Sequence, residues 1–228
     1  MAFFSEPEKF FLKLLVHRCT GCGCRLSYSS GSFCRWCRIR MFPDGSRFAG
    51  GTRVLTGFLH TGVVREMVLR LKYHGERHLS GKLAALALKS WEVSPVKGDT
   101  LIPVPSSRER LRKRGYNQAA LLASAVAART GAVSRNILVR ERGESQTEIS
   151  GARRIENVRG RFAMNGNHSF QGRVWLIDDV MTTGATITEL VSTLSHHGIR
   201  DVLPAVVCFR KLAEESIIPG KEVDYAGV

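Results

Sequence analysis

The segment Gly172–Thr188 constrains the fold of this 228-residue chain more than any other stretch. It opens with a short apolar run, Val174–Ile177, whose β-favouring residues predict a buried strand. Two carboxylates, Asp178 and Asp179, follow directly, and a loop of small hydroxyl residues around a glycine comes next. Apolar residues with helical spacing complete the pattern, which as a whole predicts an α/β fold. These helix positions are Ile187, Leu190, Val191 and Leu194.

The acidic pair and the loop suit a sugar phosphate as ligand. Backbone N–H groups in a loop at a helix N-terminus, together with threonine hydroxyls, can bind a phosphate, and a glycine allows its close approach. Two carboxylates can accept hydrogen bonds from a vicinal diol. In open α/β sheets ligands bind outside the carboxyl ends of the strands, where this loop is expected. The alternative is an ordinary capped turn in which Asp178 and Asp179 are solvated loop residues.

The segment Val174–Thr186 resembles the phosphoribosyl pyrophosphate (PRPP) motif of type I phosphoribosyltransferases, in which four hydrophobic residues and two acids precede a Thr/Gly-rich loop. The resemblance implies a type I phosphoribosyltransferase-like parallel sheet with flanking helices. It also implies that Asp178 and Asp179 bind the ribose 2- and 3-hydroxyls of PRPP or a related sugar phosphate, while the loop binds the 5-phosphate. The implied loop residues are Val180, Met181, Thr182, Thr183, Gly184, Ala185 and Thr186. Catalysis at such a site would need Mg²⁺ to shield the pyrophosphate.

The charge of the chain points to a polyanionic partner. With 34 Lys and Arg residues against 20 Asp and Glu residues, the formal net charge is +14 and the isoelectric point is about 10.1. Residues 101–170 hold 13 of the cations and only 5 of the acids. Single-stranded DNA is such a partner, because affinity for nucleic acids depends largely on neutralising phosphates. The alternative is a general effect of a basic proteome or of solubility.

A second candidate site follows the predicted strand Leu101–Val104. A proline turn leads there into a dense run of cations, which suits a pyrophosphate or a nucleic-acid backbone. A merely solvated charged face is the alternative. The predicted nucleic-acid-binding residues are Arg108, Arg110, Arg112, Lys113, Arg114 and Tyr116, and Trp36 and Phe33 are further candidates for base stacking.

Four more residues join the predicted PRPP-binding set. Ser106 and Ser107 lie in the proline turn, and Arg142 is expected to neutralise the charge of a leaving group. Lys72, in the sequence LKYHG, is a candidate for binding pyrophosphate or an acceptor, with a solvated lysine at a helix end as the alternative.

Two C-x-x-C pairs near the N-terminus predict a structural zinc site. The predicted ligands are Cys19, Cys22, Cys34 and Cys37. Pairs at this spacing can present four thiolates tetrahedrally to Zn²⁺, and Gly23 permits the turn that aims backbone N–H groups at sulfur. Two disulfides or a redox pair are the alternatives. Cys24 is a possible substitute for Cys22, and Cys208 is expected in the core.

The chain divides into three predicted parts. Residues 1–50 form an N-terminal helix and the Cys₄ module with a linker rich in Gly and Pro over 41–52, residues 51–212 form the α/β domain, and residues 213–228 form a surface tail. Residues 141–161 are expected to form a loop over the site. Strands are expected at 54–60, 136–140 and 201–209, and helices from Thr61, at 79–88 and up to Gly131. No apolar run is long enough to span a bilayer, and the predicted location is cytoplasmic.

The order of motifs along the chain resembles the competence protein F (ComF/GntX) family. The matching motifs are the cysteine pairs, LKYHG, IPVPSSRERLRKRGYNQAALLA, VWLIDDVMTTGAT, and a loop with Arg140, Arg142, Gln146, Arg154, Asn157 and Val158. The resemblance implies a role in natural competence, in moving single-stranded DNA into the cytoplasm beside a helicase-like partner. An active phosphoribosyltransferase with an unknown acceptor is the alternative, and a former enzyme whose Cys₄ module only stabilises it or docks a partner is a third possibility.

Overall fold

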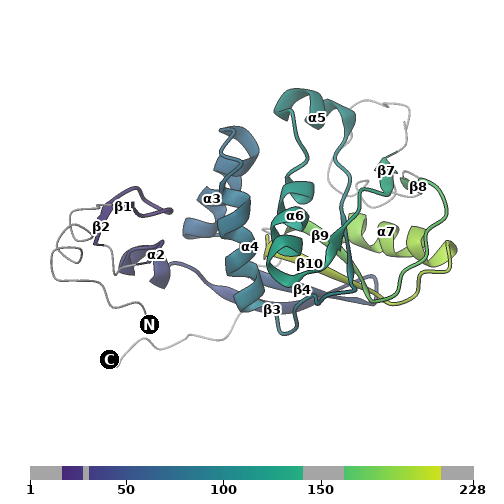
Figure 1. Ribbon diagram of the computed structural model, residues 1–228. Coiled ribbons are helices and arrows are strands. Elements are labelled where there is room, and N and C mark those ends of the chain that lie inside the picture. The colour runs from purple at the N-terminus through teal and green to yellow at the C-terminus, as the bar shows by residue number, and fades with distance from the viewer. Residues whose placement is uncertain (1–16, 28–30, 141–161, 212–228) are drawn as a thin grey trace, which may run out of the picture.

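A six-stranded sheet organises the computed structural model, which describes residues 17–27, 31–140 and 162–211 (Figure 1). The strand order is β3-β4-β10-β9-β5-β6. Neighbouring strands are parallel except at the edge, where β3 runs antiparallel to β4. The strands span Pro43–Ala49 (β3), Thr52–Leu59 (β4), Thr100–Pro103 (β5), Val133–Ser134 (β6), Val174–Met181 (β9) and Val202–Phe209 (β10).

Helices cover both faces of the sheet, which explains why β10 and the first half of β9, Val174–Ile177, are continuously apolar. Helices α3 (Gly62–Tyr73), α4 (Leu79–Ser90) and α6 (Gln118–Thr130) bury their apolar residues on one face. Helix α7 (Ala185–His196) packs on the other. The strands and helices expected from the sequence at these positions are therefore confirmed, and the fold is α/β as predicted.

The chain reverses direction across the sheet between β5 and β9. From β5, helix α6 leads outward to β6, whereas from β9, helix α7 leads the opposite way to β10. These two helices lie on opposite faces of the sheet. Such a switch point opens a crevice at the carboxyl ends of the two strands, where ligands bind in this class of fold.

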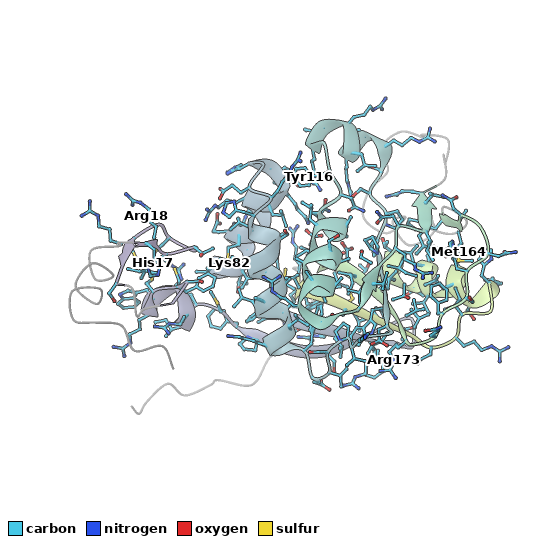
Figure 2. The ribbon with its side chains drawn as sticks, in the orientation of Figure 1. His17, Arg18, Lys82, Tyr116, Met164 and Arg173 are labelled. Atoms are coloured by element: carbon cyan, nitrogen blue, oxygen red, sulfur yellow. The ribbon has the colours of Figure 1, made fainter. Side chains whose placement is uncertain are left out.

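A buried carboxylate ties the strands together at the opposite, amino end of the sheet. Asp99 precedes β5 and accepts hydrogen bonds from the backbone N–H of Arg173 (3.0 Å) and of Val96 (3.1 Å). The indole N–H of Trp175 donates to the same carboxylate at 2.8 Å. Figure 2 shows Arg173 at the end of the molecule opposite Tyr116. All the donors around Asp99 are thus satisfied within the fold.

Two predictions about the ends of the sheet are corrected. Residues 41–52, expected as a linker, contain β3, which pairs with β4 through its backbone and therefore needs no apolar pattern. The strand expected at 136–140 does not return to the main sheet. Its residues form β7 (Leu138–Arg140), which pairs with β8 (Phe162–Met164), and the β-α-β crossover ends on β6 instead. The N-terminal helix, the 141–161 loop and the tail lie outside the described residues.

The cysteine-rich segment packs beside α3 and α4 (Figure 1). It contains β1 (His17–Arg18), β2 (Arg25–Leu26) and α2 (Arg35–Ile39). Arg70 of α3 donates to the carbonyl of Thr20 at 2.9 Å, and Lys82 of α4 donates to the hydroxyl of Ser32 at 3.0 Å. Within the described ranges, no helix is both long enough and apolar enough to cross a membrane.

Candidate functional site

A cavity of about 410 Å³ opens at the carboxyl ends of β4, β5, β9 and β10. Its walls come from the turns that follow these four strands and from the ends of α3 and α6, so it lies at the switch point of the sheet. The cavity brings together the following predicted residues: Lys72, Ser106, Arg110, Arg114, Asp178, Asp179, Val180, Thr182 and Thr186.

The two acids have different surroundings, because successive residues of a strand point to opposite faces. Asp179 is 2% exposed, and its carboxylate lies 2.6 Å from the ammonium of Lys72. Lys72 is therefore not a solvated lysine at a helix end. The carboxylate of Asp178 lines the cavity and accepts the backbone N–H of Asp179 at 2.8 Å.

This arrangement separates the pKa values of the two carboxyls. Burial and the charge of Asp179 raise the pKa of Asp178 well above its ordinary value. Burial acts in the same direction on Asp179, but the Lys72 ammonium outweighs it and lowers the pKa of that carboxyl. Burial likewise opposes the charge on Lys72, and the attraction of Asp179 reverses that effect and raises the pKa of the amine. Lys72 and Asp179 thus form a buried ion pair beside the carboxyl of Asp178.

The loop between β9 and α7 forms a small hollow of about 60 Å³. The backbone N–H groups of Thr182, Thr183, Gly184 and Thr186 donate no hydrogen bond to any described residue. Gly184 has a φ of +78°, and a Cβ there would overlap the Cβ of Ala49 on β3. The loop therefore presents free amide donors at the start of a helix, as a phosphate requires.

The remaining predicted PRPP-binding residues differ in whether they can reach a ligand. Met181 is buried in the core on the α7 face, so its side chain is not free for a ligand. The hydroxyl of Ser107 caps α5 (Arg108–Arg114) by accepting the N–H of Arg110 at 3.3 Å, and Ser107 does not line the cavity. Ala185 is in the wall of the hollow. Arg142 lies outside the described residues.

The predicted cations of α5 separate into three groups. Arg110 and Arg114 line the cavity, whereas the side chains of Arg112 and Lys113 are exposed and do not line it. Arg108 lies on the other side of the helix, at a second cavity. Helix α5 buries none of its residues and projects from the rest of the molecule (Figure 1).

The aromatic residues proposed for base stacking have three different environments. The hydroxyl of Tyr116 donates to the carbonyl of Leu71, and Arg77 covers one face of its ring. Phe33 is buried, so the prediction that it stacks on a base is wrong. Trp36, on α2, is 74% exposed and remains a candidate.

The structure adds cavity residues that sequence reasoning did not assign to the site. They are His60, Leu69, Tyr73, Val104, Pro105, Gln118, Arg140 and Arg210. His60 follows β4 directly and Arg210 follows β10, so the rule that ligands bind beyond the carboxyl ends of strands could have identified both. Burial and the nearby cations Lys72, Arg210 and Arg65 lower the pKa of His60, whereas the charge of Asp179 acts in the opposite direction.

A separate cluster of thiols lies in the N-terminal segment. The sulfur atoms of four cysteines lie within 4.8 Å of one another: Cys19, Cys22, Cys24 and Cys34. Cys24 thus joins the group together with Cys22 and takes the position predicted for Cys37. Cys37, predicted as the fourth ligand, falls outside this set but packs against it, since its N–H donates to the sulfur of Cys34 at 3.3 Å.

The thiol geometry fits a tetrahedral metal site. The sulfurs of Cys22 and Cys34 are 3.7 Å apart, close to the roughly 3.8 Å expected for two thiolates about 2.3 Å from one Zn²⁺. Burial would raise the pKa of Cys19, but backbone N–H groups of the Cys22, Cys34 and Gly21 peptides lower it to about 6. The turn at Gly23 has a φ of +74°, as predicted. The cluster can therefore hold a metal ion such as zinc.

Sequence comparison relates the chain to competence proteins. It is 28% identical over 179 residues to competence protein ComFC of Bacillus subtilis, covering 77% of this chain and 70% of that protein. It is 32% identical over 108 residues to competence protein F of Haemophilus influenzae, covering 46% of this chain and just 47% of that protein. No family model matches the chain. The resemblance to the competence protein F family is confirmed.

Among solved structures, similar chains include phosphoribosyltransferases. An adenine phosphoribosyltransferase is 14% identical with a TM-score of 0.39, covering 79% of this chain and 89% of that chain. The glutamine phosphoribosylpyrophosphate amidotransferase of B. subtilis is 20% identical with a TM-score of 0.38, covering 59% of this chain and 26% of that chain. At these TM-scores the likeness carries no inference about ligands or catalysis.

Proposed function

We propose that this chain, a relative of the competence protein F proteins, binds PRPP or a closely related sugar phosphate in the cavity at the carboxyl ends of its sheet. One observation carries the proposal: a carboxyl at Asp178 and a loop with free amides face the same cavity. A phosphorylated sugar needs both, because its phosphate takes hydrogen bonds and its hydroxyls donate them.

Each part of the ligand has a complementary wall. The 5-phosphate binds the free amides of Thr182, Thr183, Gly184 and Thr186, and the ribose diol binds Asp178. Arg110 and Arg114 neutralise the pyrophosphate. Asp179 supports the site indirectly, because its carboxylate is already paired with Lys72. Mg²⁺ would be held by pyrophosphate oxygens together with the Asp178 carboxylate, and it would supply charge neutralisation there.

Calorimetric titration with PRPP tests this proposal directly. In buffer with Mg²⁺, the protein is expected to bind PRPP more tightly than ribose 5-phosphate or pyrophosphate alone, since each of these satisfies only part of the cavity. Asp178→Asn is expected to abolish most of the binding. Asp201→Asn is the matched control, because Asp201 is an exposed acid at the amino end of the sheet. Absence of heat with wild-type protein and PRPP contradicts the proposal.

A second candidate function is binding of single-stranded DNA, and helix α5 favours it. Five of its seven residues are Arg or Lys and none is buried. It projects from the molecule (Figure 1), and two of its arginines line the cavity. Phosphates along a strand would neutralise these cations, and the exposed Trp36 offers a surface for stacking a base. This activity would serve the DNA uptake implied by the competence relatives, in the cytoplasm and beside a helicase-like partner.

Fluorescence polarisation with a labelled oligonucleotide tests the second function. The double variant Arg112→Ala, Lys113→Ala is expected to weaken binding and to reduce the slope of log affinity against log salt by about 0.7 for each phosphate that the variant no longer neutralises. Lys97→Ala is the control, because Lys97 is exposed at the amino end of the sheet. A wild-type affinity that does not change with salt contradicts this function.

The metal of the cysteine cluster is proposed to be zinc with a structural role. Elemental analysis of purified protein should find one zinc per chain. The variants Cys24→Ser and Cys37→Ser identify the fourth ligand. The variant that lacks a true ligand should lose zinc as readily as Cys34→Ser does, and the other variant should retain it. Zinc-free protein that unfolds at the same temperature as zinc-loaded protein contradicts the structural role.

A further inference from the structure

A second cavity, of about 330 Å³, lies beside the sugar-phosphate cavity. The two share Pro105, Ser106 and Arg140 in their walls. The second cavity is bounded by β5 and its turn, by α5 and α6, and by β7. It is thus a neighbouring compartment with its own lining, and the function proposed above does not use it.

Helix α5 separates the two cavities. Arg110 and Arg114, one turn apart, face the sugar-phosphate cavity. Arg108 and Leu111, three residues apart, face the second cavity. Leu111 is the apolar residue of α5, and its side chain is 38% exposed. One face of α5 therefore combines a cation with an apolar side chain at the mouth of a cavity.

The lining of the second cavity is mostly apolar. Its apolar residues are Pro103, Pro105, Leu111, Ala120, Leu138 and Val139. Among the described residues no carboxylate lines it, and Arg108 and Arg140 give it positive charge. Pockets with apolar walls and a few polar groups are the usual binding sites of flat organic ligands. A ligand for this cavity should thus combine an apolar ring with a nearby anion.

Two asparagines in the lining differ in what they can offer a ligand. The side chain of Asn117 is engaged, since its amide donates to the carbonyl of Val104 at 3.0 Å and its oxygen accepts the hydroxyl of Ser106 at 3.0 Å. The side chain of Asn136 makes no hydrogen bond within the part of the chain that the structure describes. Its amide presents one acceptor and two donors, a combination that matches the edge of a nucleobase.

We propose that this second cavity receives one unpaired base of a single-stranded nucleic acid whose phosphates bind the cations of α5. The ring lies against the apolar wall, its edge meets Asn136, and the adjoining phosphate meets Arg108. This inference rests on the proposed single-strand binding and extends it, because it adds contact with a base to contact with the backbone. The strand then runs along α5 next to the sugar-phosphate cavity.

The test compares two labelled strands of equal length, one of thymidine nucleotides and one with abasic units throughout. Both strands carry the same phosphates, so backbone contacts alone would give equal affinities. A base held in a cavity should make the thymidine strand bind roughly tenfold more tightly in polarisation measurements at fixed salt. Equal affinities for the two strands overturn the inference but leave single-strand binding intact. If wild-type protein binds neither strand, both proposals fail.

Variants of the lining locate the base. Leu111→Ser removes an apolar contact from a partly exposed position, and Ala120→Leu fills part of the cavity. Each variant should reduce the affinity ratio of the two strands, whereas Lys113→Ala should weaken both strands equally and preserve the ratio. Thermal unfolding verifies that each variant is folded. A ratio unchanged in both lining variants places the base elsewhere and overturns the assignment.

Discussion

At the amino ends of β5 and β9 the carboxylate of Asp99 accepts hydrogen bonds from two backbone amides and an indole, whereas at the carboxyl ends of the same sheet Asp179 pairs with Lys72 and its neighbour Asp178 lines a cavity. Asp99 is satisfied entirely by neutral donors fixed in the fold. Asp178, by contrast, has a pKa raised by burial and by Asp179. At the amino end of the sheet the carboxylate has all its hydrogen-bond partners within the fold, whereas at the carboxyl end a carboxyl faces a cavity that can receive a ligand.

This difference separates stability from binding. Removing a group whose partners are all internal leaves buried donors unsatisfied, and the cost appears in the unfolding free energy. Removing a group that faces a cavity leaves the unfolding free energy nearly unchanged and weakens only the binding of the ligand. Asp99 and Asp178 should therefore respond to substitution in opposite ways, and four experiments examine this contrast and the Lys72–Asp179 pair beside it.

The largest effect is expected at the amino end. Asp99→Ala removes the acceptor of Val96 N–H, Arg173 N–H and the Trp175 indole, and should lower the unfolding free energy by about 3–5 kcal/mol. Urea denaturation at neutral pH measures this loss of unfolding free energy. PRPP binding by the folded protein should stay unchanged. A loss below about 1 kcal/mol would mean that water replaces these hydrogen bonds.

The next effect concerns the buried ion pair. Asp179→Asn leaves the Lys72 ammonium without its counter-charge and should cost about 2–3 kcal/mol of unfolding free energy. The double variant Lys72→Met, Asp179→Leu should recover most of this loss, because neither charge remains buried. A double variant less stable than Asp179→Asn would show that the pair stabilises the fold beyond mutual neutralisation.

A smaller effect, confined to binding, is expected at the cavity. Asp178→Asn should weaken PRPP binding at least tenfold, or about 1.4 kcal/mol, because the neutral amide is a poorer acceptor for a diol. Its unfolding free energy at pH 7 should be equal to or above that of the wild type, since a carboxyl with a raised pKa is costly to ionise. Calorimetry and denaturation on the same sample measure the two quantities. A clear loss of stability would make Asp178 resemble Asp99 and abolish the contrast.

The smallest effect is a pH trend. A carboxyl whose pKa is higher in the folded chain stabilises the fold below its unfolded pKa, near 4, and this contribution is lost as pH rises through the folded value. The unfolding free energy of the wild type relative to Asp178→Asn should therefore fall as pH rises from 4 to 8. Asp179 has a lowered pKa, so its contribution is instead lost as pH falls below 4. If the unfolding free energies of the wild type and of Asp178→Asn change with pH in the same way, the raised pKa of Asp178 is contradicted.

The sequence predicted the elements of the sheet well because their signals are local. The apolar run before Asp178 and the glycine after α6 each mark an element within a few residues. Strand β3 escaped prediction because its sequence, PDGSRFA, has turn residues and its stability comes from backbone pairing with β4, which lies outside the segment. Strand partners are in general set by contacts that no single stretch contains.

The motif of the site was predictable, but the roles of its two acids were not. Asp178 and Asp179 are equivalent in the sequence pattern, and only the arrival of Lys72 from α3 distinguishes them. His60 and Arg210 carry no motif of their own, and their place in the cavity follows from the order of strands in the sheet. Residues that act through a partner distant in the sequence thus need the fold before they can be assigned.

The contact between Ala49 and Gly184 has a mechanical consequence. Ala49 ends β3, and its Cβ lies where a Cβ on Gly184, the N-cap of α7, would have to be placed. A side chain larger than that of alanine at position 49, or any side chain at position 184, would therefore displace the loop with free amides from the edge strand.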